Sequence, residues 1–489
     1  MRFVNARFID LATGTVDDPI DFSVDGGRLV RSVPEGPEEV IDLGGRFVIP
    51  GLWDAHVHFT SWAVYRHLLD LSPAADQQSM LSLLTEFAAD HPHDDPLHAV
   101  GLRPAGWPQP PDTTALDAAF PDRAVVIEMF DMHQIWLNTV ALRRYGFADQ
   151  TDAGPGSGLL VEEQVTDVLR RLPQPDQRAV HRWVVEQQQA AAAKGVVGIV
   201  DFENDWPVRH WRDRIDAGVD KLRVVAATWP DDLLAAITAG VHSGAPLDTS
   251  GLLIGGPLKV IADGSLSART AWCRQPYADP RPDAPCGIAN RTPQELADLM
   301  SRADQAGIDS AIHAIGDAAV GMVLDCFAET GAHGRIEHAQ LLTAGDITRM
   351  AALGLTAGVQ PAHLLTDREF IERQWGGRAD RCFALRELLD AGVPVEFGSD
   401  APVTPLDPWL AIRTAVLRAE PGQAPWHPEQ AITLQEALCA STHGVRTLVP
   451  GAVADIAVLD DDPFQLGAAR LDELRVSLTM VDGRITHRL

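Results

Sequence analysis

The sequence predicts an α/β protein built around a parallel barrel, and three observations lead to this prediction. Eight short apolar segments recur through the middle of the chain, and amphipathic stretches such as residues 292–307 and 381–392 lie between several of them. The later apolar segments are far enough apart for a helix to return between parallel strands. Both ends of the chain carry short β-rich runs separated by Gly, Asp and Pro turns.

The eight apolar segments define the expected barrel, which would span residues 51–439. We expect its strands at residues 51–59, 196–203, 222–228, 257–264, 309–316, 335–342, 355–361 and 393–400. The gap between the first two segments is too long for one crossover helix, so an inserted α/β subdomain is expected at about residues 60–190. We expect residues 1–50 and 440–489 to form one composite β domain, although two separate β caps would give the same pattern.

Composition and charge limit the classes of partner. The chain has 489 residues and a formal net charge of −28, which repels phosphate backbones and anionic lipid surfaces. We therefore expect a small-molecule substrate, with neither nucleic acid nor membrane as a partner. The five cysteines are odd in number and show no zinc or redox spacing, and the N-terminus has no signal-peptide pattern. These features predict a cytoplasmic protein, and they leave a homodimer open.

Two histidines lie two positions apart in the first apolar segment, "GLWDAHVHF". Alternate side chains of a strand share a face, so His56 and His58 point the same way, roughly 6.6 Å apart along the backbone. Such a pair can converge on one metal ion, but surface or core histidines show the same spacing. The metal interpretation therefore depends on what else lies near this strand end.

Three more residues of ligand type lie in other strand segments. His313 lies in the last part of the fifth segment, His338 in the middle of the sixth, and Asp400 ends the eighth. The carboxyl ends of barrel strands form one mouth, where active sites are built. Each residue alone could be structural. Together with His56 and His58, they predict a metal centre at that mouth.

A lysine lies inside the fourth apolar segment. Lys259 is one of three lysines in the chain, and a buried ammonium tends to lose its proton. A neutral lysine amine can react with carbon dioxide to form a carbamate, whose two oxygens can bridge two divalent ions. Arginine could not do this, because its guanidinium stays protonated. The alternative is a lysine that reaches solvent from the strand end or pairs with Asp263.

Several longer segments resemble those of a known family. "GLWDAHVHF", "LKVIADGSLSARTAW", "AIHAIGDAAV", "RIEHAQ" and "GSDAPVTPLDPW" resemble the signature segments of the amidohydrolase superfamily. They are most similar to the branch (amidohydrolase family 3) that contains N-substituted formamide deformylases and YtcJ-like proteins. The similar segments follow in order from about residue 40 to the end, where "GAVADIAVLD" resembles the closing β-sandwich segment.

This resemblance implies a distorted (β/α)8 TIM barrel, with a β-sandwich domain built from both termini. It also implies a ligand set for two ions. One ion would be held by His56, His58 and Asp400, and the second by His313 and His338. Lys259, as N6-carboxylysine, would bridge the two ions. Members of the superfamily vary at the bridge, and some keep one ion. Nitrogen and oxygen donors without thiolate suit zinc, and manganese, nickel or iron also fit.

These residues predict a metal-dependent hydrolase. An ion at this centre would lower the pKa of a water and polarise a carbonyl, and Asp400 would act as general base and then general acid. We expect cleavage of a carbon–nitrogen bond of amide, N-acyl or N-formyl type. Hydrolysis of an ester, lactone or cyclic amide at the same centre is an alternative. A catalytically silent scaffold is another, against which the six ligand-type residues argue.

Three other residues are candidates for substrate contact. His133 lies in a part of the insertion that resembles the family's segment over the barrel mouth, but an exposed loop histidine would look the same. His363 follows the seventh strand segment and could contact substrate or be an ordinary polar loop residue. Arg269 follows the Lys259 strand, where a structural ion pair with Asp263 is the simpler expectation.

Overall fold

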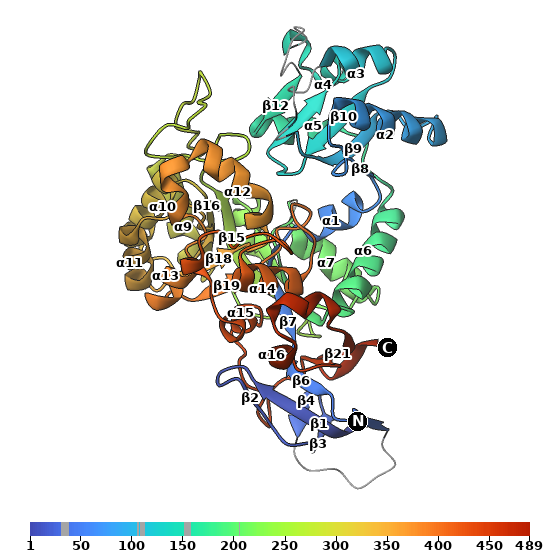
Figure 1. Cartoon of the computed structure of the whole chain (residues 1–489), viewed down its shortest axis with the longest axis vertical. Helices are drawn as coiled ribbons and strands as arrows, with labels where there is room; N and C mark the ends of the chain where they lie inside the picture. Colours follow the sequence, from blue (N-terminus) through green and yellow to red (C-terminus); the bar gives the residue numbers. More distant parts are fainter. Residues whose placement is uncertain (31–38, 105–106, 108–112, 151–157, 205) are drawn as a thin grey trace.

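The computed structural model describes residues 1–30, 39–104, 107, 113–150, 158–204 and 206–489. Figure 1 shows three parts along the long axis of the molecule: a sheet built from both chain ends, a central barrel surrounded by helices, and an inserted α/β unit at the opposite end. In the described part of the chain, no helix is both long and apolar enough to cross a membrane.

The central sheet is the predicted parallel barrel. Its strands are, in spatial order, β7 (Leu52–Val57), β13 (Val196–Asp201), β14 (Arg223–Thr228), β15 (Leu253–Ile261), β16 (Ser310–Ala314), β17 (Gly334–His338), β18 (Thr356–Val359) and β19 (Val395–Phe397). Each expected segment supplies one strand, and every neighbouring pair is parallel, which confirms the barrel prediction. A parallel bridge between Val57 and Ala401 joins the two edges. A Cβ on Gly398 would lie 2.5 Å from Cβ of His56, so closure at this point requires glycine.

Helices cover the outside of the barrel. They are α1 (Phe59–Tyr65), α6 (Gln177–Ala192), α7 (Pro207–Asp216), α8 (Leu233–Thr238), α9 (Pro293–Asp304), α10 (Asp317–Thr330), α11 (Ala344–Leu353), α12 (His363–Gln374), α13 (Leu385–Asp390), α14 (Pro408–Leu417) and α15 (Leu434–Ala440). Local sequence explains their starts: Thr292 caps α9 in a capping box with Glu295, and Pro293 occupies its first turn. The buried faces of most of these helices join one large apolar core, whereas α1, α6 and α7 pack in a second cluster and α12 in a third.

The two chain ends combine in one mixed sheet, rather than in two separate caps. Its strands are β1 (Arg2–Asp10), β2 (Thr15–Val16), β3 (Ile20–Asp25), β4 (Arg28–Val30), β5 (Val40–Asp42), β6 (Phe47–Pro50), β20 (Ile456–Leu459), β21 (Val476–Val481) and β22 (Arg484–Arg488). Strand β6 pairs in parallel with β1 and antiparallel with β20, so it joins the two termini. It leads directly into β7 of the barrel.

The inserted unit lies between β7 and β13 in the sequence. Its five-stranded sheet contains β8 (Leu69–Asp70), β9 (Leu97–Leu102), β10 (Val125–Met129), β11 (Gln134–Leu137) and β12 (Leu159–Val161), packed with α2 (Gln77–Asp90), α3 (Thr113–Ala119), α4 (Thr139–Tyr145) and α5 (Glu163–Arg171). Because the chain leaves β7 at the carboxyl end of that strand, the insertion emerges at the barrel mouth (Figure 1). The domain boundaries stay a prediction.

Candidate metal centre

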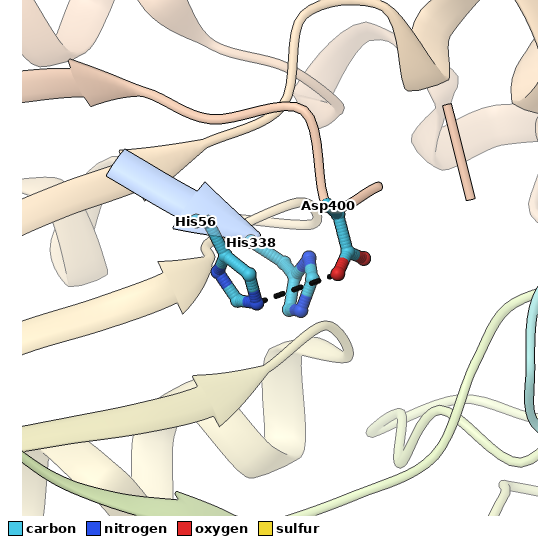
Figure 2. A group of neighbouring side chains, drawn as sticks. All are labelled: His56, His338 and Asp400. Atoms are coloured by element: carbon cyan, nitrogen blue, oxygen red, sulfur yellow. Dashed lines mark ion pairs between the residues drawn. The ribbon is translucent and has the colours of Figure 1, made fainter. Parts of the chain in front are cut away.

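Three buried residues from different strands of the barrel meet at its carboxyl end. His56 lies in β7, His338 is the last residue of β17, and Asp400 follows β19. The sixth strand is shorter than expected, so His338 ends it instead of lying in its middle. One ligand atom from each residue lies within 4.8 Å of the others. Figure 2 shows the three side chains pointing toward one another, with Nε2 of His56 3.4 Å from Oδ1 of Asp400.

The backbone at two of these residues is strained. His338 has a φ of 69° and Asp400 a φ of 55°, in the left-handed region that residues with a Cβ rarely adopt. Such conformations persist where the surroundings hold them, and they gather at functional sites. At Asp400 the backbone N–H donates to the carbonyl oxygen of His56 at 2.7 Å. Asp54 ties the same two segments together, because its Oδ1 accepts the N–H groups of His56 and Ser399.

The ring of His56 is oriented from its far side by Glu337. Oε2 of this fully buried carboxylate lies 2.5 Å from Nδ1 of His56. Glu337 in turn accepts a hydrogen bond from Nε of Arg335, whose Nη1 also donates to Glu396 at 2.6 Å. A proton on Nδ1 of His56 leaves its Nε2 with a lone pair facing the mouth, as metal-binding histidines require.

Burial keeps three of the histidines at this mouth neutral. Desolvation lowers the pKa of His338 to about 3 and holds the pKa values of His56 and His313 well below their usual range. Burial alone would raise the pKa of Asp400, but His56 and the hydrogen bond from His58 outweigh it and hold that pKa well below its usual range. Neutral imidazoles and an ionised carboxylate are the forms that bind metal ions.

Lys259 reaches the same cluster from β15. Its Nζ lies 3.2 Å from Nε2 of His56 and 4.4 Å from the ring centroid of Phe202. The side chain is buried, and desolvation lowers the pKa of Lys259 to about 8, although Glu337 and Asp400 oppose the shift. The lysine therefore faces the mouth, within reach of His56, and its lowered pKa makes the neutral amine more accessible than in a free lysine.

His58 and His313 each lie against one of the three central residues. Nε2 of His58 lies 3.5 Å from Oδ1 of Asp400, which raises the pKa of His58 against the opposing effect of burial. The ring of His313 is 4.5 Å from that of His338, centroid to centroid. Nε2 of His313 lies 3.3 Å from the carbonyl oxygen of Gly264, so a local contact holds this ring.

The insertion places His133 against the mouth. Its ring centroid is 5.7 Å from that of His313, and its Nδ1 lies 3.2 Å from Oε2 of Glu162. Glu162 also accepts a hydrogen bond from Thr270 in the loop after β15, which links the insertion to the barrel. Burial alone would lower the pKa of His133, but Glu162 raises it to about 9. His133 is therefore a cation held beside the centre.

His363 and Arg269 are placed differently. Nε2 of His363 lies 3.9 Å from Oδ2 of Asp400, at the start of α12. Arg269 lies away from the cluster and pairs with Asp279 at 2.5 Å. The prediction of an ion pair between Arg269 and Asp263 is wrong. Asp263 instead accepts the backbone N–H groups of Ile315, Gly316 and Trp272. Asp263 thus orders the loop after β15.

The donor set fits a divalent cation. Nδ1 of His58, Nδ1 of His338 and Nε2 of His363 are buried without a hydrogen-bond partner among the described residues. Buried polar atoms of this kind are rare in folded proteins unless a ligand satisfies them. Imidazole nitrogens with carboxylate oxygen are common ligands of zinc and related ions. The residues could therefore hold one ion between His56, His338 and Asp400.

Three residues that the sequence analysis did not identify as functional support the site. Glu337 orients His56, Asp54 joins β7 to the loop of Asp400, and Glu162 holds His133. Two of them carry a sequence signal, since an acidic residue inside an apolar strand, as in "LWDAHV" and "RIEH", needs a buried partner. Glu162 has no such signal, because its role depends on how the insertion folds back.

A closed parallel barrel with histidine and carboxylate side chains at its mouth is typical of one class of barrel enzymes. Comparison with known families identifies the family within this class, because the model of the amidohydrolase family matches residues 39–487. The chain belongs to the amidohydrolase family, as the resemblance of its segments indicated, and it is a hydrolase.

Relatives match nearly the whole chain. The protein YtcJ of Bacillus subtilis (strain 168) is 28% identical over 497 residues, covering 94% of this chain and 92% of the relative. The N-substituted formamide deformylase of Arthrobacter pascens is 26% identical over 525 residues, covering 94% and 93%. An uncharacterized metal-dependent hydrolase from Pyrococcus horikoshii OT3 shares the fold, with a TM-score of 0.76 and 22% identity over 96% of this chain and 99% of that one.

Proposed function

We propose that this protein is a metal-dependent hydrolase that cleaves a carbon–nitrogen bond of amide, N-acyl or N-formyl type in a small molecule. The observation that carries the proposal is the convergence of His56, His338 and Asp400 at the barrel mouth. The similarity to an N-substituted formamide deformylase supports the bond type. The five free cysteines fit the reducing cytoplasm expected for this protein.

The ligands in this proposal come from this chain's own residues. Where one divalent ion is bound, most simply zinc, His56, His338 and Asp400 would hold it. Where two are bound, His56, His58 and Asp400 would hold the first, and His313 and His338 the second. Bound there, the metal supplies a water of lowered pKa and polarises the scissile carbonyl. The neutral amine of Lys259 would add to carbon dioxide with loss of a proton, and the resulting carbamate would bridge the ions.

Asp400 is the proposed general base and acid. Its carboxylate is ionised, buried, and in contact with His56 and His58. It would take a proton from the attacking water and later pass it to the leaving amine nitrogen, so the carbon–nitrogen bond breaks without release of a strongly basic anion. Nε2 of His58, 3.5 Å from the carboxylate, would help to hold it in place.

Two further residues would contact the substrate. His133 enters from the insertion as a cation beside His313, where it can donate a hydrogen bond to a substrate oxygen. His363 lies at the start of α12, with an unpartnered Nε2 among the described residues. Arg269 is a weaker candidate, because its guanidinium is engaged by Asp279.

A substrate screen with one variant tests the proposal. Wild-type protein and Asp400→Asn would be assayed against a panel of formamides, N-acyl amines and matched esters, with metal content and thermal unfolding measured on both. We expect amide hydrolysis by wild type and a loss of about a thousandfold or more in Asp400→Asn, which should stay folded. Activity of the variant within a few-fold of wild type would refute the role of Asp400, and faster cleavage of esters than of every amide would refute the bond type.

A further inference from the structure

A cleft of about 710 Å³ lies between helix α12 of the barrel and the insertion. Its wall on the α12 side includes Thr366, Arg368, Glu369 and Arg373, and Arg103 and Phe130 of the insertion line it from the other side. We call this space the arginine cleft. In Figure 1, α12 lies on the side of the barrel that faces the insertion.

Both walls of the cleft continue into the candidate metal centre. Helix α12 begins at His363, which contacts Asp400, and Oγ1 of Thr366 donates to the carbonyl oxygen of His363 at 3.0 Å. On the other wall, Phe130 directly precedes Asp131, whose Oδ1 accepts the N–H of His133 at 3.2 Å. A molecule bound at the centre could therefore extend into the cleft.

The cleft is positive in an otherwise acidic protein. Three of its lining residues are arginines and one is a glutamate, whereas the whole chain carries a formal charge of −28. None of the three arginines forms an ion pair with a carboxylate of the described residues. The nearby carboxylate of Asp367 is engaged instead by the side-chain amide of Gln340 at 2.8 Å. The guanidinium groups therefore have no direct carboxylate partner among the described residues and can pair with an anion from outside.

Arg103 is already partly desolvated. Its Nε is buried without a hydrogen-bond partner among the described residues, and its guanidinium carbon lies 4.9 Å from the ring centroid of Phe130. Burial lowers the pKa of Arg103, with Asp367 and Asp70 opposing the shift. Stacking on an aromatic ring fixes the plane of a guanidinium and prepares it for a two-pronged contact with a carboxylate.

Helix geometry sets how far the other arginines lie from the centre. Arg368 and Arg373 follow His363 by five and ten positions in α12, or roughly 8 Å and 15 Å along the helix axis. Thr366, Glu369 and Arg373 have the spacing of one helix face, so they line the cleft together. Arg368 retains free N–H groups beside the one that donates to the carbonyl oxygen of Ala424.

We propose that the arginine cleft is an anionic subsite, which binds a carboxylate of the substrate at a distance from the bond that is cleaved. This inference rests on the proposed function and narrows the substrate class to amides that carry a second, acidic group. Arg103 and Arg368 would hold the carboxylate, and Arg373 would add positive charge toward the open end.

The test uses matched pairs of substrates. Mono-p-nitroanilides of straight-chain dicarboxylic acids of increasing length would each be compared with the same compound whose free acid is replaced by a carboxamide. At the best length we expect kcat/KM for the acid to exceed that for the carboxamide by at least about tenfold, as a charge-assisted contact allows. The ratio should fall toward one in Arg103→Gln and Arg368→Gln. Arg470→Gln, an exposed arginine paired with Glu473, is the control and should keep the ratio.

The outcomes separate this inference from the proposed function. Equal rates for acid and carboxamide at every length, or a preference that survives in both cleft variants, would refute the subsite while leaving amide hydrolysis in place. If no anilide is cleaved, calorimetric titration of the same pairs decides the inference alone. Tighter binding of the acid that is lost in Arg368→Gln supports the subsite, and equal binding refutes it.

Discussion

Nδ1 of His56 lies 2.5 Å from Oε2 of Glu337, although the two residues are 281 positions apart in the sequence. Both side chains are almost completely buried. The contact fixes the tautomer of His56 and leaves its Nε2 facing Asp400 and Lys259. One buried carboxylate thus sets the direction of a central ligand of the candidate centre.

The Glu337 contact leads to a prediction about metal affinity. Glu337→Gln removes the charge behind His56 and should weaken metal binding by about 10- to 100-fold, as loss of such supporting partners does. Competition with a chromogenic chelator would measure the change. Glu128→Gln, at a buried glutamate of the insertion, is the matched control and should bind metal as wild type does. Equal affinities in all three proteins would mean that Glu337 does not orient a ligand.

Gly398 should be intolerant of any side chain. A Cβ there would lie 2.5 Å from Cβ of His56, so Gly398→Ala must push β7 away from the loop that carries Asp400. We expect a loss of about 1–3 kcal/mol in the free energy of unfolding, together with lower metal content. Gly377→Ala is the control, because nothing lies within 4 Å of a Cβ at that position. If both variants behave alike in urea unfolding and metal content, the close approach is unimportant.

Much of this arrangement could be predicted from the sequence, and some could not. Recurring apolar segments, the later ones at helix-sized spacings, predicted all eight barrel strands, and the residue types near their ends led us to expect histidines and Asp400 together at the mouth. Glu337 was missed because its role depends on where β17 lies across the barrel from β7. The arginine cleft was missed because Arg103 and Arg368 approach each other only after the insertion folds back over the mouth. The homodimer stays a prediction.

His133 should matter for turnover and not for metal binding. It contacts the centre from the insertion and is held by Glu162, so His133→Ala should lower kcat/KM by about tenfold or more with metal content unchanged. Glu162→Gln should cause a smaller loss, mainly in KM, because the ring keeps its place but loses the charge that holds it. Steady-state kinetics beside elemental analysis would check both. A parallel fall in metal content would assign His133 to the metal centre itself.

Glu128 should make stability depend on pH. Burial raises the pKa of Glu128 from 4.5 to about 8 in the folded chain. Between these two pH values the carboxyl group of Glu128 stays protonated in the folded state and is ionised in the unfolded state. The free energy of unfolding should therefore fall as pH rises from 6 to 8, by up to about 2 kcal/mol from this group. Urea unfolding of Glu128→Gln should show a correspondingly smaller decrease. Glu86→Gln, at an exposed glutamate of the same insertion, should follow wild type, and identical slopes in all three proteins would exclude the effect.

The metal content per chain, measured by elemental mass spectrometry on protein purified without added metal, tests the central claim most directly. Wild type should carry about one or two divalent ions, and His338→Ala should lose most of that metal while keeping its fold. Lys259→Ala, measured beside them, should fall from two ions to one or none if the lysine bridges a pair. Metal-free wild type, or a content that His338→Ala leaves unchanged, would contradict the assignment of His56, His338 and Asp400 as a metal centre.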